Sequence, residues 1–310
     1  MNEPEEFFLG LVVRLMIGEC RCPTDVAVCL RGVCTTSGVG ASPESRDDMF
    51  KMKKLLLVGV LCLAAAIGLS GCGGNQEAAT SSSGGKVLKV GASVDFAPFE
   101  FQDEGQSEYQ GFDMDLIRAI GKEMGYEVEI SNIGFDGLIP ALQAKNVDVL
   151  ISGVTINDER KQNVDFSDPY YESGLTMVVR EDEQNIKTFS DLKGKKIAVQ
   201  IGTTSAKEAK KIEGAEVKEL NTPADCFMEL KNGGVDAVVN DRPVNDYYIH
   251  KSGQTGVKTL PERLTSEDYG IAVAKGNKEL AEKINAALKK LKENGEYDKI
   301  YAKWFGGAKK

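Results

Sequence analysis

The chain has 310 residues, of which 42% are hydrophobic and 27% are charged. This composition is typical of a globular protein long enough for about two lobes, and it excludes disorder along the whole chain. Acidic residues outnumber basic ones by 47 to 38, which gives a formal net charge of -9. Because the charges are interspersed rather than gathered into basic runs, no nucleic-acid partner is expected.

A lipoprotein signal peptide is predicted at residues 49–72. Three lysines precede an apolar run over residues 55–67, and the small tetrapeptide Leu69-Ser70-Gly71-Cys72 follows it. The run is shorter than the roughly 20 residues of a membrane-spanning helix, which favours a cleaved signal over a permanent anchor. The tetrapeptide resembles the lipobox of bacterial lipoproteins. We therefore expect Cys72 to be lipidated and the rest of the chain to lie outside the cytoplasm, anchored to the cell membrane.

Two flanking segments are expected to carry no part of the fold. Residues 1–48 precede the signal, so we interpret them as an untranslated or disordered extension. The alternative is a small metal or disulfide module built on Cys20, Cys22, Cys29 and Cys34, although their spacing matches no tetrahedral zinc pattern. Residues 73–85 are rich in Gly, Ser, Ala and Thr and are expected to form a flexible tether.

The remainder of the chain contains a single cysteine, Cys226. An internal disulfide is therefore excluded there. Cys226 lies four residues before Leu230 in an apolar helical pattern, which predicts a buried structural thiol rather than a nucleophile. The one histidine, His250, follows a Tyr-Tyr-Ile run in a predicted helix and is expected to be exposed or structural.

From residue 87 onward, short apolar runs alternate with helical patterns, which predicts an α/β fold with mainly parallel sheets. The expected strands are 88–92, 147–152, 196–200 and 235–240, and the clearest helices are 113–124 and 136–145. A helix end running into a buried strand occurs twice, at 142–149 and at 230–238. The repetition predicts two similar lobes with a ligand cleft beyond the carboxyl ends of the strands.

An anion site is predicted where the strand 147–152 ends. Gly153 stops the strand, Asn157 can cap the next helix, Thr155 offers a hydroxyl, and Arg160 can grip a carboxylate with two hydrogen bonds. Two residues of the other lobe, Thr203 and Thr204, could add donors.

A cation site is predicted at Asp241, which ends the strand 235–240 and can pair with an ammonium. Taken alone, Asp241 could equally be a helix cap or a solvated turn acid, and Arg160 a surface ion pair. Their conjunction favours a receptor for a free amino acid, whose carboxylate and ammonium share one carbon. Phe96 and Phe135 occur in loop-like settings and are expected to form the walls of the cleft; Phe99 and Phe101 are expected in the core.

At these residues the chain resembles the polar amino-acid binding proteins of ATP-driven importers, a family of type II periplasmic binding proteins, over about residues 87–305. The matching stretches include Ala97-Pro98-Phe99-Glu100, 111–116, 152–160, Asp165-Phe166-Ser167-Asp168-Pro169-Tyr170-Tyr171, Gly202-Thr203-Thr204 and 297–305. The ligand contacts that the resemblance implies are Arg160, Thr155 and Thr204 for the carboxylate, Asp241 and the Gly153 carbonyl for the ammonium, and Phe96 and Phe135 for the side chain.

The resemblance also implies how the chain is divided. It should cross twice between lobes, near residues 170–174 and 266–270. Lobe 1 then comprises 86–174 and 268–310, and lobe 2 comprises 175–267. The tail from residue 273 is expected to fold back onto lobe 1.

The expected ligand is a polar L-amino acid, with glutamine as the best candidate. Basic-amino-acid binders of the family place an acid where this chain has Ser93, which disfavours arginine and lysine. The chain as a whole most resembles glutamine-binding members, through Phe101 and the stretches 136–142 and 303–306. Ser93, Gln200 and Asn240, however, replace residues that those members use near the ligand side chain.

The implied partners are the permease subunits of an ABC importer. No cofactor and no catalysis are expected, and the protein should be a monomer. Two alternatives stay open: a secreted dehydratase-like enzyme on the same fold, acting through carboxylates alone, and a ligand-sensing subunit of a receptor.

Overall fold

The computed structural model describes residues 85–250 and 255–306, all within one compact unit, Thr80–Lys310. The predicted extension 1–48, the signal 49–72 with Cys72, and the tether as far as residue 84 lie outside the described residues. Within the described part, no helix is long and apolar enough to cross a membrane.

Two five-stranded sheets form the framework of the described residues. The first has the strand order β2-β1-β3-β12-β4, and its strands are Tyr126–Asn132, Lys86–Ala92, Val149–Leu150, Ala272–Ala274 and Val164–Phe166. Its helices are α2 (Phe112–Met124), α3 (Leu138–Gln143), α4 (Asp158–Asn163), α8 (Lys278–Glu293), α9 (Glu296–Phe305) and the 3-10 turn η2 (Phe135–Gly137). We call this sheet with its helices lobe 1.

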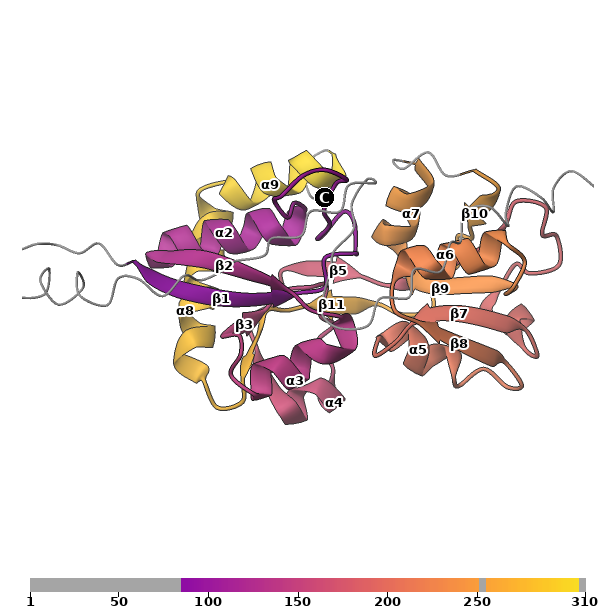
Figure 1. The fold of residues 1–310 in the computed structure, drawn as a ribbon, viewed down its shortest axis with the longest axis horizontal. Coiled ribbons are helices and arrows are strands. Elements are labelled where there is room, and N and C mark those ends of the chain that lie inside the picture. The colour runs from indigo at the N-terminus through magenta and orange to yellow at the C-terminus, as the bar shows by residue number, and fades with distance from the viewer. Residues whose placement is uncertain (1–84, 251–254, 307–310) are drawn as a thin grey trace, which may run out of the picture. The chain divides into compact units, whose positions relative to one another are not determined.

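The second sheet has the order β10-β6-β9-β7-β8, with strands Val257–Thr259, Leu175–Arg180, Ala237–Asp241, Lys196–Gln200 and Glu216–Leu220. Its helices are α5 (Thr204–Ala209), α6 (Pro223–Lys231), α7 (Arg242–His250) and the 3-10 turn η3 (Phe189–Leu192). We call this sheet with its helices lobe 2. Two short strands, β5 (Tyr171–Ser173) and β11 (Glu267–Tyr269), pair with each other between the two sheets (Figure 1).

The α/β class and the two crossings are confirmed, but the sheets are mixed rather than mainly parallel. In lobe 1, β1 pairs in parallel with β2 and β3, whereas β12 is antiparallel to β3 and β4. In lobe 2, β7 is parallel to β8 and β9, whereas β6 is antiparallel to β9 and β10. The antiparallel strands β12 and β6 are those that directly follow the crossings β11 and β5, and each enters its sheet from the crossing.

Local sequence explains where most elements begin and end. Helix α2 buries an apolar face and ends at Gly125, whose left-handed conformation forms the C-cap. The helix predicted at 136–145 is observed as η2 followed by α3. It ends at residue 143, because Lys145 takes a positive φ of 61° and the amide of Asn146 closes the end by donating to the Ala141 carbonyl. Strand β7 has the predicted bounds, while β3 is shorter than predicted.

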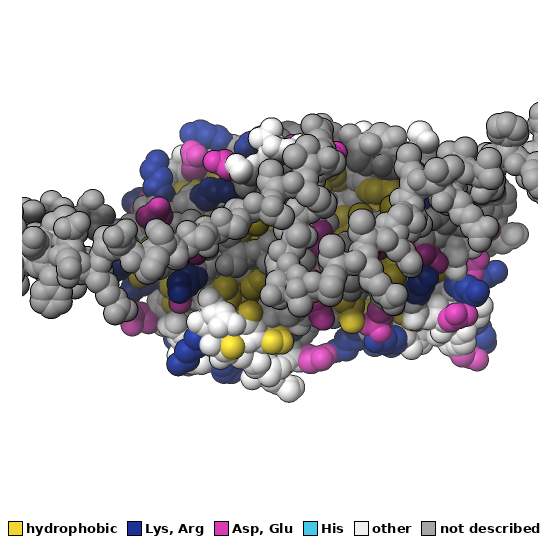
Figure 2. Space-filling view, in the orientation of Figure 1, with side chains coloured by type: hydrophobic (Ala, Val, Ile, Leu, Met, Phe, Trp, Pro, Cys, Tyr) yellow, Lys and Arg dark blue, Asp and Glu magenta, His cyan; other side chains and the backbone are white. Residues whose placement is uncertain are grey.

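The C-terminal helices pack on α2, as predicted from the resemblance. Their aromatic residues complete the core of lobe 1, in which Phe99, Phe112 and Tyr170 are fully buried. Cys226 is a buried free thiol in α6, and His250 is exposed at the end of α7, so both predictions are confirmed. In the face shown in Figure 2, basic and acidic side chains are interspersed.

Candidate functional site

Arg160 extends from the short helix α4 toward the other lobe. The Asn157 side chain caps this helix by accepting a hydrogen bond from the Arg160 amide at 2.9 Å, as predicted. The guanidinium donates to the Thr155 carbonyl at 3.0 Å and to the Gly202 carbonyl of lobe 2 at 3.3 Å. It also lies 5.3 Å from the centre of the Phe135 ring. Arg160 is only 8% exposed, so this cation is held between the lobes rather than on the surface.

Asp241 is the last residue of β9 and is 7% exposed. It accepts a hydrogen bond from the Ser173 hydroxyl at 2.7 Å, and this hydroxyl in turn accepts one from the Tyr269 hydroxyl at 3.0 Å. Burial raises the pKa of Asp241 to about 6, and the charge of Glu267 adds to the rise, while these hydrogen bonds and Arg160 oppose it. Ser173 belongs to the hinge strand β5 and Tyr269 to β11, so this chain of hydroxyls from the hinge orients the carboxylate.

Arg160 and Asp241 interact across the two lobes. Burial lowers the pKa of Arg160, and the charges of Glu267 and Asp241 act in the opposite direction. Each group therefore shifts the other toward its charged form, as opposite charges do when they are near enough to interact. The two charged groups chosen from sequence are thus brought together, from segments of the chain 81 positions apart in numbering.

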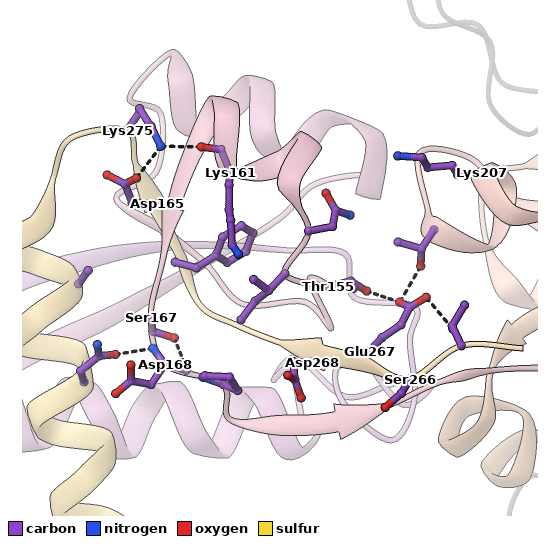
Figure 3. A pocket seen from close by; sticks show the side chains of 18 of the residues that line it. Thr155, Lys161, Asp165, Ser167, Asp168, Lys207, Ser266, Glu267, Asp268 and Lys275 are labelled. Atoms are coloured by element: carbon purple, nitrogen blue, oxygen red, sulfur yellow. Dashed lines mark hydrogen bonds and ion pairs between the residues drawn. The ribbon is translucent and has the colours of Figure 1, made fainter. Parts of the chain in front are cut away.

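Glu267 is a third charged group of this region, and no motif in the sequence points to it. Its Oε2 accepts hydrogen bonds from Thr155 of lobe 1 at 2.6 Å and from Thr204 of lobe 2 at 2.8 Å (Figure 3). Its Oε1 accepts from Thr265 at 2.9 Å. The two threonine hydroxyls predicted to bind a ligand carboxylate therefore bond to a carboxylate of the chain itself. Glu267 was missed because only the pairing of β11 with β5 brings it to both lobes.

Gly153 and Thr203 have structural roles in the same region. The Gly153 amide donates a hydrogen bond to Asp113 at 2.9 Å. Gly153 has a φ of 52°, and its α-carbon lies against the Phe96 ring, so that an added Cβ would lie only 2.9 Å from the ring. Only glycine suits that conformation and approach. The Thr203 hydroxyl caps α5 by accepting from the Ala206 amide, and it donates to the Gln200 carbonyl at 2.6 Å.

The predicted aromatic walls differ in their surroundings. Phe96 is 7% exposed and stacks on Phe99 within the core of lobe 1. Phe135 is half-buried and, with Arg160 and Gly202, lines a cavity of about 110 Å³. Phe99 is fully buried as predicted, whereas Phe101 is half-buried and packs on the Trp304 ring at 5.7 Å.

Ser93, Gln200 and Asn240 are all buried, with exposures of 2%, 3% and 5%. The first two share one partner that was not predicted, Asp95. The Ser93 hydroxyl donates to Asp95 Oδ1 at 3.1 Å, and the Gln200 amide of lobe 2 donates to Asp95 Oδ2 at 3.4 Å. Asn240 lies beside Gln200 in the sheet, where β9 runs parallel to β7.

A buried pair of acids supports the loops of the site. Glu100 and Asp113 are both fully buried. The Ser152 hydroxyl donates a hydrogen bond to Glu100 at 2.6 Å, and the Tyr170 hydroxyl donates one to Asp113 at 2.7 Å. Burial raises the pKa of Asp113 to about 6, and burial together with the neighbouring Asp113 raises that of Glu100 well above its usual value. Of the two acids, Glu100 is thus the one shifted more strongly toward its protonated form by the charge of its neighbour. Sequence reasoning missed both acids because they lie in apolar motifs.

An open groove of about 980 Å³ is lined by residues of both lobes and by the hinge residues 265–268. Figure 3 shows Thr155, Lys207 and Glu267 at one end and Lys275 with Asp165 at the other. Lysines and acids alternate along it. Among the residues that the structure describes, no group of three or more His, Cys, Asp or Glu side chains could hold a metal ion.

Comparison with known proteins identifies the family. A model of the bacterial extracellular solute-binding proteins, family 3, matches residues 88–307. The chain belongs to this family. It is 39% identical over 261 residues to the "Probable histidine-binding protein" of Neisseria gonorrhoeae, with 82% of this chain and 96% of that protein covered. It is 37% identical over 263 residues to the "Arginine-binding extracellular protein ArtP" of Bacillus subtilis (strain 168), with 83% of this chain and 100% of that protein covered.

Solved structures of amino-acid binding proteins share the fold. An ancestral arginine-binding protein, solved with bound glutamine and with bound arginine, is 50% identical with a TM-score of 0.69, covering 71% of this chain and 98% of its own. The ancestral amino acid-binding protein AncCDT-1, described as a precursor of cyclohexadienyl dehydratase, is 43% identical with a TM-score of 0.66, covering 71% of this chain and 95% of its own. The fold is the type II periplasmic binding protein fold, as expected from sequence.

Proposed function

We propose that this protein captures a free polar L-amino acid outside the cytoplasm and delivers it to the permease subunits of an ABC importer. The observation that carries the proposal is the pair of buried opposite charges, Arg160 and Asp241, contributed by different lobes. A free amino acid presents a carboxylate and an ammonium on one carbon. An anion site and a cation site in close proximity match that arrangement.

Burial of these groups makes binding depend on lobe movement. Arg160 and Asp241 are each more than nine-tenths buried, so a ligand reaches them only when the lobes separate. In an open form both charges are hydrated, and closure around a zwitterion removes water while giving each charge a partner. Ligand occupancy is thereby converted into a closed shape that a membrane partner can recognise.

The resemblance supplies roles for the neighbouring residues. Thr155 and Thr204 would assist Arg160 with the ligand carboxylate, and the Gly153 carbonyl would assist Asp241 with the ammonium. Because both threonine hydroxyls donate to Glu267, the incoming carboxylate must share or replace those hydrogen bonds. Phe135, which already stacks on the guanidinium, is well placed to cover the ligand side chain.

Glutamine is the ligand favoured by the sequence. The ancestral arginine-binding protein supports the view that a site of this kind accepts glutamine as well as arginine, since both complexes have been solved. We further propose that Cys72 carries the lipid anchor, that lobe 1 comprises 86–174 and 268–310 and lobe 2 175–267, and that the protein is a monomer.

A ligand screen with matched variants tests the function. In a thermal-shift screen against the twenty common amino acids, the purified protein should be stabilised strongly by one amino acid or one chemical group of amino acids. Arg160→Ala and Asp241→Ala should each abolish that shift, because each leaves a charged group of the ligand unpaired at a cost of several kcal/mol. Arg118→Ala is the control, since Arg118 bonds to the Tyr109 carbonyl on lobe 1 and faces no ligand group. An unchanged shift in either site variant would mean that the wrong residues have been chosen.

A dehydratase is the second candidate function. It is favoured by the likeness to AncCDT-1 and by acids, such as Asp241, whose raised pKa suits proton transfer. Incubation with prephenate-like acids would reveal turnover, whereas a binding protein returns them unchanged. A receptor subunit would show the same binding and differ only in its partner.

A further inference from the structure

Asp95 lies where the two lobes meet, in the loop that follows β1. Its carboxylate accepts hydrogen bonds from Ser93 of its own lobe and from the Gln200 amide of lobe 2. Gln200 ends β7 and Asn240 lies beside it in β9, directly before Asp241. Asp95 therefore contacts Gln200, one of the residues expected around the ligand side chain. Asn240, another of them, directly precedes Asp241, which is expected to hold the ligand ammonium.

The charge of Asp95 has no counter-ion among the described residues that influence it. Burial is the largest cause that raises its pKa to about 6, and the acid Asp225 of α6 raises it further; only hydrogen bonds act in the opposite direction. The charge of Asp95 in turn contributes to the raised pKa of the buried Glu100. A half-buried carboxylate that lies near two other acids, Asp225 and Glu100, is unfavourable unless a cation joins it.

A second observation at the same place points to a hydrogen-bond donor. Gln200 is 3% exposed, and although its amide nitrogen bonds to Asp95, no donor among the described residues lies within hydrogen-bond distance of its Oε1. A buried acceptor without a donor is unfavourable by about 1–3 kcal/mol. Asp95 and Gln200 together thus present acceptors to a group that carries several N–H donors and a positive charge.

We propose that Asp95 makes this protein selective for amino acids with a cationic side chain, of the arginine and lysine class. The inference deepens the proposed function and rests on it: Arg160 and Asp241 hold the backbone groups of the ligand, and the guanidinium or ammonium of its side chain pairs with Asp95. A guanidinium also supplies a donor for Gln200 Oε1. A glutamine amide could satisfy the hydrogen bonds but would leave the carboxylate without a counter-charge.

The same geometry explains why the sequence disfavoured basic ligands. Position 93, at which basic-amino-acid binders of the family place an acid, is a serine in this chain. Its hydroxyl donates to Asp95, two residues further along the loop. The negative charge is thus retained but is supplied by a neighbouring residue. The hydrogen bond from the Gln200 amide then holds the Asp95 carboxylate against lobe 2.

Calorimetric titration of arginine, lysine and glutamine into the full-length protein tests the inference. The wild type should bind arginine or lysine at least tenfold more tightly than glutamine. Asp95→Asn should reduce the affinity for the cationic ligand by roughly 30-fold or more. It should change the affinity for glutamine by less than threefold. Asp95→Glu should keep the cationic preference. Asp225→Asn removes a nearby charge in α6. It should reduce the affinity for the cationic ligand much less than Asp95→Asn does.

The outcomes separate the two proposals. If the wild type binds glutamine as tightly as arginine and lysine, or if Asp95→Asn retains the wild-type affinity for them, the selectivity inference is wrong and the proposed function stands. If no amino acid binds the wild type, the proposed function itself is wrong. Thermal unfolding of each variant shows that a lost affinity is not a lost fold, and Asp95→Glu provides a second folded variant if Asp95→Asn is unstable.

Discussion

Lys207 Nζ lies 2.6 Å from Glu159 Oε2 and joins α5 of lobe 2 to α4 of lobe 1. Both side chains are exposed, at 51% and 68%. The hydrogen bond lowers the pKa of Glu159 and raises that of Lys207. Because its two ends belong to different lobes, this ion pair exists only when the lobes approach, and it contributes to closure rather than to the folding of either lobe.

Breaking this ion pair should weaken ligand affinity modestly. Lys207→Ala and Glu159→Gln are each expected to reduce affinity by about two- to fivefold in low salt, because exposed ion pairs are weak. The loss should disappear at about 0.5 M salt, where exposed charges are screened. Calorimetric titration at the two salt concentrations measures both effects. Lys211→Ala is the control, since Lys211 pairs with Glu208 inside lobe 2; an equal loss in this control would contradict the assignment.

Neutralising Glu267 should strengthen ligand binding. Its carboxylate shares the hydroxyls of Thr155 and Thr204 and lies near Arg160, so it repels a ligand carboxylate that binds there. Glu267→Gln keeps an oxygen acceptor but removes the charge, and we expect affinity to rise roughly three- to tenfold, on the scale of one ordinary hydrogen bond. Asp268 is an exposed acid of the same strand, and Asp268→Asn should change the ligand affinity little. Weaker binding by Glu267→Gln would show that this carboxylate supports the ligand.

Asp241 should make the free protein less stable as the pH rises from about 4 to 6. Its pKa is raised from 3.8 to about 6 in the folded state, so the native protein binds more protons than the unfolded chain in this window, and stability falls with increasing pH. At neutral pH the buried charge costs about 3 kcal/mol, at about 1.4 kcal/mol for each pKa unit.

Asp241→Asn therefore provides a direct measurement of that cost. Its melting temperature without ligand should exceed that of the wild type by roughly 5–10 °C at pH 7.5, and the difference should shrink toward pH 4, where the wild-type carboxyl is protonated. The same variant should lose ligand binding at pH 7.5. A melting-temperature difference that is equal at both pH values would contradict the raised pKa.

Cys226 should be unreactive in the folded protein. It is 1% exposed, and burial raises the pKa of its thiol to about 12, which lowers the thiolate fraction on the order of a thousandfold. Ellman's reagent should therefore modify Cys226 only after unfolding in denaturant. A Met228→Cys variant adds a thiol to the same helix at a position that is 61% exposed, and this thiol should react at once. Rapid reaction of Cys226 itself would contradict its burial.

Local sequence predicted those features that depend on neighbouring residues. The cap of α4 by Asn157, the bounds of β7 and the burial of Cys226 each follow from side-chain chemistry or from periodicity within about ten residues. The fold class followed from the alternation of strand and helix patterns. The helix predicted at 136–145 was too long, because the positive φ of Lys145 ends it and leaves no trace in hydrophobic periodicity.

The sequence alone determined the type of protein: an α/β chain of two lobes with a guanidinium and a carboxylate at the ends of strands. Tertiary structure alone decided what surrounds those two groups. Glu267 reaches Thr155 and Thr204 through the hinge pairing, and Asp95 reaches Gln200 through the meeting of the lobes. Such contacts join residues about 60 to 110 positions apart, and their energy depends on burial and on the sum of nearby charges, neither of which any local pattern contains.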